Sequence, residues 1–279
     1  MEIPKHVLTK IIDNAIIEDF GSFGDLTSQS LENKFNQITA LITSNQEGIL
    51  SGLKCAEMSF KKLDEKINFN SKLKDGDPVK VNSVIASITG NALSILSVER
   101  TALNFLGHMS GIASQTSEYV NLISHTNTKI LSTRKTSPGL RVIEKYAVQC
   151  GGGYNHRFGL DYGVLIKDNH IKVANGITNA VKNIERNIPY LSNMEVEVDT
   201  IEQFEECQKL GIQNILLDNM GPEKIKECMN INRNNSILEA SGGINLNNIK
   251  EIAETGVDYI SIGRLTHSFT SLDVSLHIA

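Results

Sequence analysis

The sequence predicts an α/β protein in which a first α+β unit is followed by a parallel α/β barrel. Two observations predict this class. Up to about residue 111, helical segments surround short β-rich runs that are punctuated by Gly, Asn and Asp. From about residue 112, short apolar runs alternate with helix-like segments, which is typical of parallel strands joined by helical crossovers.

The first unit opens with a helix over residues 5–19, where apolar residues recur at helical spacing. From about 36 to 95 the runs become β-rich, and the alternation in DGDPVKVNSVIASITG predicts a half-exposed strand pair. Within this region KCAEMSFKKLDEK predicts a helix. A further helix is expected over residues 97–111, whose apolar residues form a broad side.

The second unit contains apolar runs that predict strands: KILST, GVLIKDNH, MEVEVD, NILLDN, SILEASGG and YISIG. Segments such as TIEQFEECQKLG predict the intervening helices. An open doubly wound sheet and a barrel both give this alternation. No GxGxxG follows a strand, and most strands end in a charged or small polar residue. These features favour a barrel, because its chemistry takes place at the carboxyl ends of the strands. Closure by six, seven or eight strands is left open.

Composition and charge argue against several classes of protein. Of the 279 residues, 40% are hydrophobic and 21% charged, as in ordinary globular domains, and the formal net charge is -5. The acidic balance argues against general nucleic-acid binding. No run approaches the ~20 apolar residues of a membrane-spanning helix, and the N-terminus lacks signal-peptide features. The four cysteines form no CxxC pair, so we expect reduced thiols in a cytoplasmic enzyme.

Cations are concentrated between Lys129 and Arg157, where six Lys or Arg residues accompany one carboxylate, Glu144. A basic run alone is most often a solvated helix face. Cations around a cavity, however, suit a substrate with several negative charges, and Arg adds bidentate recognition of carboxylate or phosphate. The cations expected at the barrel mouth are Arg134, Lys135, Arg157 and Lys167, with Arg141 nearby in sequence.

The run MEVEVD places carboxylates in an expected strand. Because side chains alternate along a strand, Glu195, Glu197 and Asp199 share one face. Carboxylates there are costly unless cations or a metal meet them, and the alternative is an exposed polar face on an edge strand. Asp218 closes the next strand and favours a functional site. Carboxylates beside a phosphate site suit Mg²⁺, which prefers oxygen ligands.

Two glycine turns, SGG at 241–243 and SIG at 261–263, open the loops after the last two strands. In barrels this position commonly binds phosphate through backbone N–H groups and a helix N-terminus. Taken together, these residues predict a barrel enzyme that acts on a multiply anionic, phosphorylated substrate with Mg²⁺. They do not identify the substrate.

Longer motifs extend over nearly the whole chain: EDFGSFGDLTS, ERTALNFLGHMSGIAS, TRKTSPGLR, EKYAVQCGGGYNHRFGLDYGVLIKDNHI, EVEVDTIEQ, LLDNM, LEASGGI and ETGVDYISIGRLTHS. In order and spacing they resemble the quinolinate phosphoribosyltransferases (nicotinate-nucleotide pyrophosphorylase, carboxylating). The resemblance implies the type II phosphoribosyltransferase fold. Its parts would be an N-terminal α/β sandwich domain over 1–111, an open α/β barrel over 112–265, and a tail over 266–279 that packs back on the first domain.

The resemblance also implies a reaction in which quinolinate and phosphoribosyl pyrophosphate give nicotinate mononucleotide, pyrophosphate and CO₂ in de novo NAD biosynthesis. It implies a homodimer, or a higher oligomer, in which the partner's N-terminal domain completes each active site. Quinolinate brings two carboxylates, and the sugar donor brings a 5-phosphate and a pyrophosphate. These charges agree with the mouth inferred above. No nucleic-acid or membrane partner is expected.

By the same resemblance, three groups of residues form the site. Those expected around the dicarboxylate are Thr133, Arg134, Lys135, His156, Arg157 and Lys167, with Arg100 from the other subunit. Glu197 and Asp218 match acidic positions near the ribose and the Mg²⁺–pyrophosphate, and with Lys135 they are the expected catalytic residues. The segments expected to hold the 5-phosphate are Ser241, Gly242 and Gly243, and Ile262, Gly263 and Arg264.

One position departs from the family pattern, since Ser132 precedes TRKT where many bacterial members have Asp. The loss of a carboxylate beside Arg134 predicts a slightly more cationic pocket. This difference leaves open a related phosphoribosyltransferase-like group associated with molybdate transport. A non-catalytic anion-binding protein on the same fold is a further alternative. The complete KTSPGLR and GGGYNHR motifs favour the quinolinate enzyme.

Overall fold

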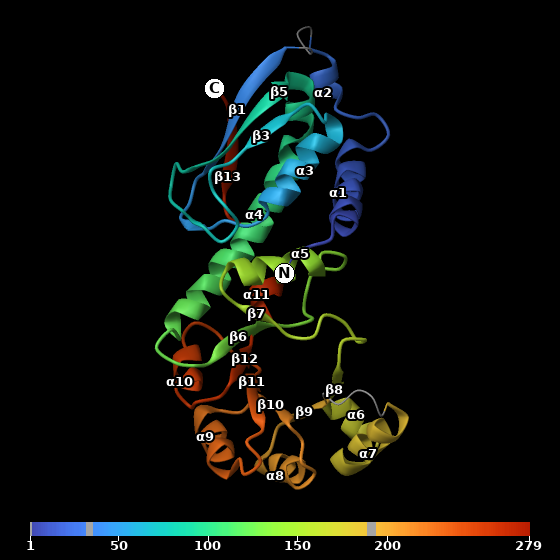
Figure 1. Cartoon of the computed structure of the whole chain (residues 1–279), viewed down its shortest axis with the longest axis vertical. Helices are drawn as coiled ribbons and strands as arrows, with labels where there is room; N and C mark the ends of the chain where they lie inside the picture. Colours follow the sequence, from blue (N-terminus) through green and yellow to red (C-terminus); the bar gives the residue numbers. More distant parts are fainter. Residues whose placement is uncertain (1, 32–35, 189–193) are drawn as a thin grey trace. The chain divides into compact units, whose positions relative to one another are not determined.

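The computed structural model describes residues 2–31, 36–188 and 194–279, and the chain forms two compact units (Figure 1). The first unit comprises Met1–Ser117, Thr136–Gly152 and Leu265–Ala279, and the second comprises Glu118–Lys135 and Gly153–Arg264. The segment after the first strand of the second unit therefore belongs with the N-terminal part of the chain. The domain limits expected from the sequence, at residues 111 and 265, stay a prediction.

The first unit packs helices against a four-stranded antiparallel sheet. The strand order is β13 (Val274–Ile278), β1 (Gln37–Ser44), β5 (Val84–Asn91) and β3 (Asn68–Asn70). A separate pair is formed by β2 (Gly48–Ile49) and β4 (Pro78–Val79). The helices are α1 (Lys5–Phe20), α2 (Leu26–Gln29), α3 (Leu53–Leu63), the first part of α4 (Ala92–Leu122) and α5 (Arg141–Cys150). Ile42, Ile88, Phe60 and Leu103 lie in the shared core of sheet and helices.

Helix α4 is longer than predicted, because Gly111, where its end was expected, lies inside it. The helix spans 31 residues, whereas the sequence predicted one over 97–111. A side chain at Gly107 or Gly111 would collide with the backbone carbonyl of Leu272 or Thr270, at 2.8 and 2.2 Å from an added Cβ. The glycines therefore allow the C-terminal segment to approach the helix closely, and Leu272 N–H donates to Gly107 O at 2.9 Å.

The second unit is the predicted parallel barrel, with seven strands in an open arrangement. The strand order is β7 (Tyr154–Asn155), β6 (Lys129–Ser132), β12 (Tyr259–Ser261), β11 (Ile237–Ser241), β10 (Asn214–Asp218), β9 (Met194–Val198) and β8 (Val164–Ile166), and every pairing is parallel. The helices between strands are α6 (Asp168–Val173), α7 (Ile177–Asn187), α8 (Ile201–Lys209), α9 (Pro222–Ile231) and α10 (Ile249–Ala253). The short α11 (Arg264–His267) follows the last barrel strand.

Two details of the barrel strands depart from the sequence expectation. Strand β7 was not predicted, because two residues are too few to show an apolar alternation. Strand β9 ends at Val198, so Asp199 follows the strand and is exposed. The other two carboxylates of MEVEVD, Glu195 and Glu197, are half-buried on one face of β9, and the valines between them are buried on the other.

Among the described residues, no helix has both the length and the apolar character that a membrane span requires.

Candidate active site

The carboxyl ends of the second unit's strands bring most of the predicted site residues to one edge of the sheet. Because the strands are parallel, these ends lie on the same side. The residues that occupy them are Thr133, Arg134 and Lys135 after β6, His156 and Arg157 after β7, Lys167 after β8, Glu197 in β9 and Asp218 at the end of β10. Three cations of the basic stretch, Arg134, Lys135 and Arg157, thus lie at strand ends, whereas Arg141 and Lys145 lie on α5 of the first unit.

Two arginines of the cluster lie near enough for their charges to interact. Burial, followed by the neighbouring positive charge of Arg134, lowers the pKa of the Arg157 guanidinium, whereas Glu195 opposes this effect. Arg157 Nη1 donates to Gly163 O at 2.9 Å, which holds the guanidinium in one direction. Both arginines are half-buried, and Lys135 is exposed. Two neighbouring guanidinium groups are suited to binding a dicarboxylate.

The cationic and acidic sides of the mouth meet directly at Lys167 and Glu197. Lys167 Nζ donates to Glu197 Oε2 at 2.5 Å, and the two side chains are 44% and 13% exposed. The expectation that a cation meets the carboxylates of β9 therefore agrees with the geometry. Each group of the pair neutralises the other before any substrate binds.

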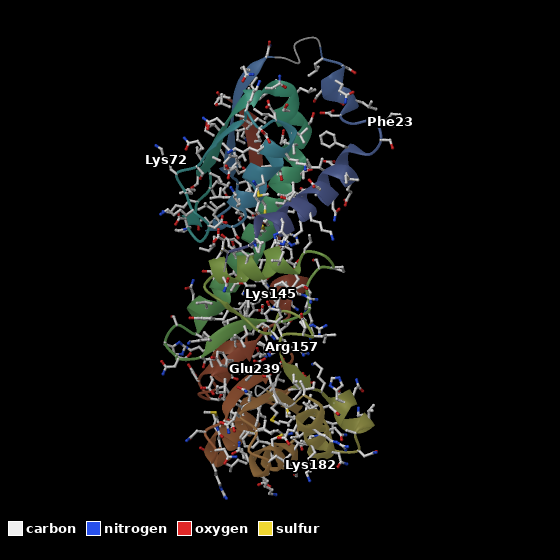
Figure 2. All side chains as sticks on the ribbon, turned by 45° about the vertical axis from the view of Figure 1, so that its right-hand side comes forward. Phe23, Lys72, Lys145, Arg157, Lys182 and Glu239 are labelled. Atoms are coloured by element: carbon white, nitrogen blue, oxygen red, sulfur yellow. The ribbon has the colours of Figure 1, made fainter. Side chains whose placement is uncertain are left out.

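A second cluster contains His156, Glu195 and Glu239, of which only Glu239 was missed in the sequence. His156 Nε2 lies 2.8 Å from Glu195 Oε2 and 3.6 Å from Glu239 Oε2. Burial, followed by the charge of Glu195, raises the pKa of Glu239 to about 7. Glu239 and Arg157 line one cavity of about 380 Å³. Both side chains are labelled in Figure 2. A carboxylate within the apolar run SILEASGG was the signal that could have identified Glu239.

His156, Glu195 and Glu239 do not suit a metal ion, although their ligand atoms lie within 4.8 Å of one another. Arg157 N–H donates to His156 Nδ1 at 2.7 Å, so that nitrogen must accept and the ring proton lies on Nε2. The ring then points an N–H, not a lone pair, at the two carboxylates. Glu197 and Asp218 fit Mg²⁺ better, because they offer hard oxygen ligands at the ends of two adjacent strands.

The loop after β11 has the tight backbone that its glycines predict. Gly242 has φ +89°, and an added Cβ would lie 2.2 Å from Asn219 Oδ1. Asn219 follows Asp218, donates to its carboxylate at 2.6 Å, and also donates its backbone N–H to Ser241 O at 2.8 Å. The loop is followed by α10, which begins only at Ile249 and has five residues.

The remaining predicted residues have different surroundings. Ile262 is buried, Gly263 is half-buried, and Arg264 is exposed, with its charge close enough to Tyr119 to affect the pKa of that phenol, which burial raises. Arg100 and Arg141 belong to the first unit, so their part in the site stays a prediction.

Ser132 is buried, and its hydroxyl donates to Asn155 Oδ1 at 2.8 Å. The serine that departs from the family pattern therefore ties β6 to β7.

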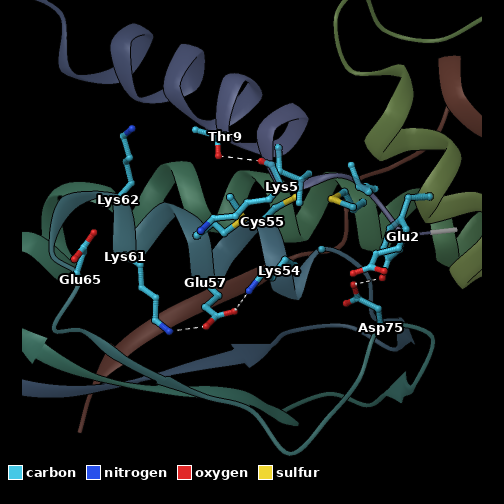
Figure 3. Close-up of a pocket in the computed structure, with 16 residues that line it drawn as sticks. Glu2, Lys5, Thr9, Lys54, Cys55, Glu57, Lys61, Lys62, Glu65 and Asp75 are labelled. Atoms are coloured by element: carbon cyan, nitrogen blue, oxygen red, sulfur yellow. Dashed lines mark hydrogen bonds and ion pairs between the residues drawn. The ribbon is translucent and has the colours of Figure 1, made fainter.

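A larger cavity of about 710 Å³ lies in the first unit, between α1 and α3 (Figure 3). Among the described residues that line it there is no predicted site residue. Its lysines Lys54 and Lys61 both pair with Glu57, at 2.9 and 2.7 Å. Because these lysine charges are compensated by Glu57, this cavity should bind an anionic substrate more weakly than the strand ends do.

Comparisons with known proteins agree with the architecture and with the motifs. The family model for the quinolinate phosphoribosyl transferase N-terminal domain matches residues 25–110, and the model for the C-terminal domain matches residues 112–277. A probable nicotinate-nucleotide pyrophosphorylase [carboxylating] of Bacillus subtilis is 42% identical over 271 residues, which cover 97% of this chain and 93% of that protein.

Two solved structures are also similar to this chain in sequence and in fold. The nicotinate-nucleotide pyrophosphorylase of Ehrlichia chaffeensis is 41% identical with a TM-score of 0.94, and the similarity covers 100% of both chains. That of Francisella tularensis is 38% identical with a TM-score of 0.95, covering 100% of this chain and 98% of the other. These values extend the similarity over both compact units.

Proposed function

The chain belongs to the quinolinate phosphoribosyltransferase family, and from this premise we propose that it transfers a phosphoribosyl group from phosphoribosyl pyrophosphate to quinolinate. The products are nicotinate mononucleotide, pyrophosphate and CO₂. The observation that carries the proposal is the meeting of paired arginines and the Lys167–Glu197 pair at one edge of the barrel. Such an edge suits a dicarboxylate on one side and a sugar that becomes cationic on the other.

The dicarboxylate is bound by cations in this proposal. Arg134 and Arg157 each offer a guanidinium fork, which matches the geometry of a carboxylate. Lys167 adds a positive charge. When quinolinate binds, the Lys167 ammonium leaves Glu197 and pairs with a substrate carboxylate. Thr133 and Lys135 lie at the same strand end, where Thr133 Oγ1 accepts the Lys135 N–H at 3.0 Å. A second copy of the chain would contribute Arg100, as the family resemblance implies.

The transfer step needs no activated side-chain nucleophile, because the pyridine nitrogen of quinolinate attacks C1 of the ribose. As the bond from C1 to the pyrophosphate oxygen breaks, positive charge develops on the sugar. Glu197 and Asp218 stabilise that charge from the ends of β9 and β10. Release of Glu197 from Lys167 by the substrate carboxylate would make it available for this task. The residues thus act by positioning and by charge neutralisation.

Decarboxylation follows from the chemistry of the product. Alkylation of the nitrogen converts the ring to a pyridinium, which accepts the electron pair left at C2 when the bond to CO₂ breaks. A proton from solvent then replaces the lost carboxylate at C2. Arg134 and Arg157 hold the ring in place while this occurs.

Mg²⁺ would be held by Glu197 and Asp218, with water and pyrophosphate oxygens as further ligands. When bound, the ion neutralises the charge of the departing pyrophosphate. The backbone at Ser241–Gly243 and at residues 262–264 would bind the 5-phosphate, because glycines allow close approach of N–H groups to an anion. These assignments rest on the family resemblance and on the position of the loops after β11 and β12.

The test is an absorbance assay of nicotinate mononucleotide formation from phosphoribosyl pyrophosphate, with quinolinate as substrate and nicotinate as the matched control. We expect turnover with quinolinate and little with nicotinate. Turnover with nicotinate alone would eliminate the decarboxylating reaction. Binding of quinolinate without turnover would instead support a non-catalytic anion-binding protein.

A further inference from the structure

The barrel sheet is open between its two edge strands, and side chains cross this opening. Strands β7 and β8 lie at opposite ends of the strand order, and among the described residues no backbone ladder joins them. His156 follows β7 and binds Glu195, which lies on β9 beside β8, at 2.8 Å. Arg157 also follows β7 and binds the carbonyl of Gly163, just before β8, at 2.9 Å.

The hydrogen bonds of His156 and Arg157 cross a cavity. The cavity of about 380 Å³ is lined by residues from both edges, with Asn155, His156 and Arg157 on one side and Gly163 and Glu195 on the other. These hydrogen bonds cross the cavity and join its two sides. Two hydrogen bonds hold Arg157: its side chain donates to Gly163 O, and its backbone N–H donates to the ring of His156.

The hydrogen bonds of His156 fix the direction of its ring. Arg157 N–H donates to Nδ1 at 2.7 Å, and Nε2–H donates to Glu195 Oε2 at 2.8 Å. This pattern requires the neutral Nε2–H tautomer. Glu239 Oε2 lies 3.6 Å from the same Nε2, which is beyond hydrogen-bond distance. Glu195 is therefore the carboxylate that holds the ring.

We propose that Glu195 is a positioning residue: through His156 it ties the end of β7 to β9 across the opening of the sheet and thereby holds Arg157 in its direction toward Gly163. The kinetic consequence rests on the proposed function, because Arg157 is there a ligand of quinolinate. The structural consequence, the tautomer of His156, does not depend on any activity.

Glu195→Leu removes the acceptor at nearly unchanged size, and Glu195→Gln retains an acceptor without the charge. For Glu195→Leu we expect a quinolinate KM raised about tenfold, the usual effect of one lost hydrogen bond to a charged group, with kcat within about threefold of the wild type. Glu195→Gln should recover most of the loss. Glu239→Leu makes the same change in the same cavity without removing a hydrogen bond of His156, and should raise KM clearly less.

The second readout is nitrogen NMR of histidine-labelled full-length protein without substrates, with the His156 signals assigned by His156→Gln. The wild type should show the Nε2–H tautomer with a hydrogen-bonded proton, and Glu195→Leu should lose that bond. If Glu195→Leu does not fold, Glu195→Ser replaces it, because its hydroxyl is too short to reach the ring.

Two results would overturn the proposal: an Nδ1–H tautomer in the wild type, or equal KM increases for Glu195→Leu and Glu239→Leu. If the wild type produced no nicotinate mononucleotide, the proposed function would fall. The tautomer measurement would then still decide whether Glu195 holds His156.

Discussion

Replacement of Lys167 by Met separates the role of this residue in stability from its role in substrate binding. The ammonium lies 2.5 Å from Glu197 Oε2, and the Lys167 side chain is 44% exposed. Solvent screening of such a pair limits its contribution to the free energy of unfolding to about 1 kcal/mol or less. Lys167→Met should therefore lower the melting temperature by only a few degrees.

The effect on substrate binding should be larger, because bound quinolinate displaces water from the ammonium. A hydrogen bond between charged groups contributes about 1.5–3 kcal/mol, which corresponds to a KM raised about 10- to 100-fold. The assay is a quinolinate titration at saturating phosphoribosyl pyrophosphate, with circular dichroism melting in parallel. Lys172→Met is the matched control, because Lys172 lies on α6, is 73% exposed and pairs with Asp168 at 3.2 Å.

Lys172→Met should leave the quinolinate KM within about threefold of the wild type. A Lys167→Met variant that retains the native fold and also stays within that limit would show that Lys167 does not bind quinolinate. Equal KM increases in the two variants would also contradict this role, because the effect would then come from net charge rather than from the position of Lys167.

Further predictions concern other parts of the site. Arg157→Lys should raise the quinolinate KM about tenfold, since an ammonium cannot bind Gly163 O and a carboxylate in the fork geometry of a guanidinium; equal KM values would contradict this. Gly242→Ala should lower the melting temperature by about 4–10 °C, because φ is +89° and the new Cβ would meet Asn219; an unchanged melting temperature would show that the loop adapts freely. The pKa of Glu239 is raised to about 7, so the wild type should lose unfolding free energy as the pH rises from about 4.5 through 7, and Glu239→Gln should flatten this dependence in denaturant titrations. A chelator should abolish turnover and Mg²⁺ should restore it, whereas full activity in the chelator would exclude the proposed ion.

Six of the barrel strands could be located along the chain because each is a short apolar run and most of them end in a charged or small polar residue. Ile215 and Leu217 are both fully buried in β10, and Asp218 then ends the strand at the barrel edge. The strand–helix alternation could therefore be recognised from the sequence alone. Strand β7 was not, since its two residues form a strand only through their pairing with β6.

The contacts of the site could be predicted only in part. Lys167 and Glu197 were expected at the same mouth from their positions at strand ends, but their direct pairing depends on side-chain directions that no pattern encodes. Glu239 looked like one more residue of an apolar run. Its contact with His156 joins strands β11 and β7, which lie three places apart in the sheet, and local sequence carries no signal for such a pairing.

The most direct measurement of the central claim is a crystal structure of the full chain with quinolinate. We expect the two carboxylates to lie against Arg134 and Arg157, and the Lys167 ammonium to turn from Glu197 to the ligand. Quinolinate bound in the cavity between α1 and α3, with the Lys167–Glu197 contact intact, would contradict it.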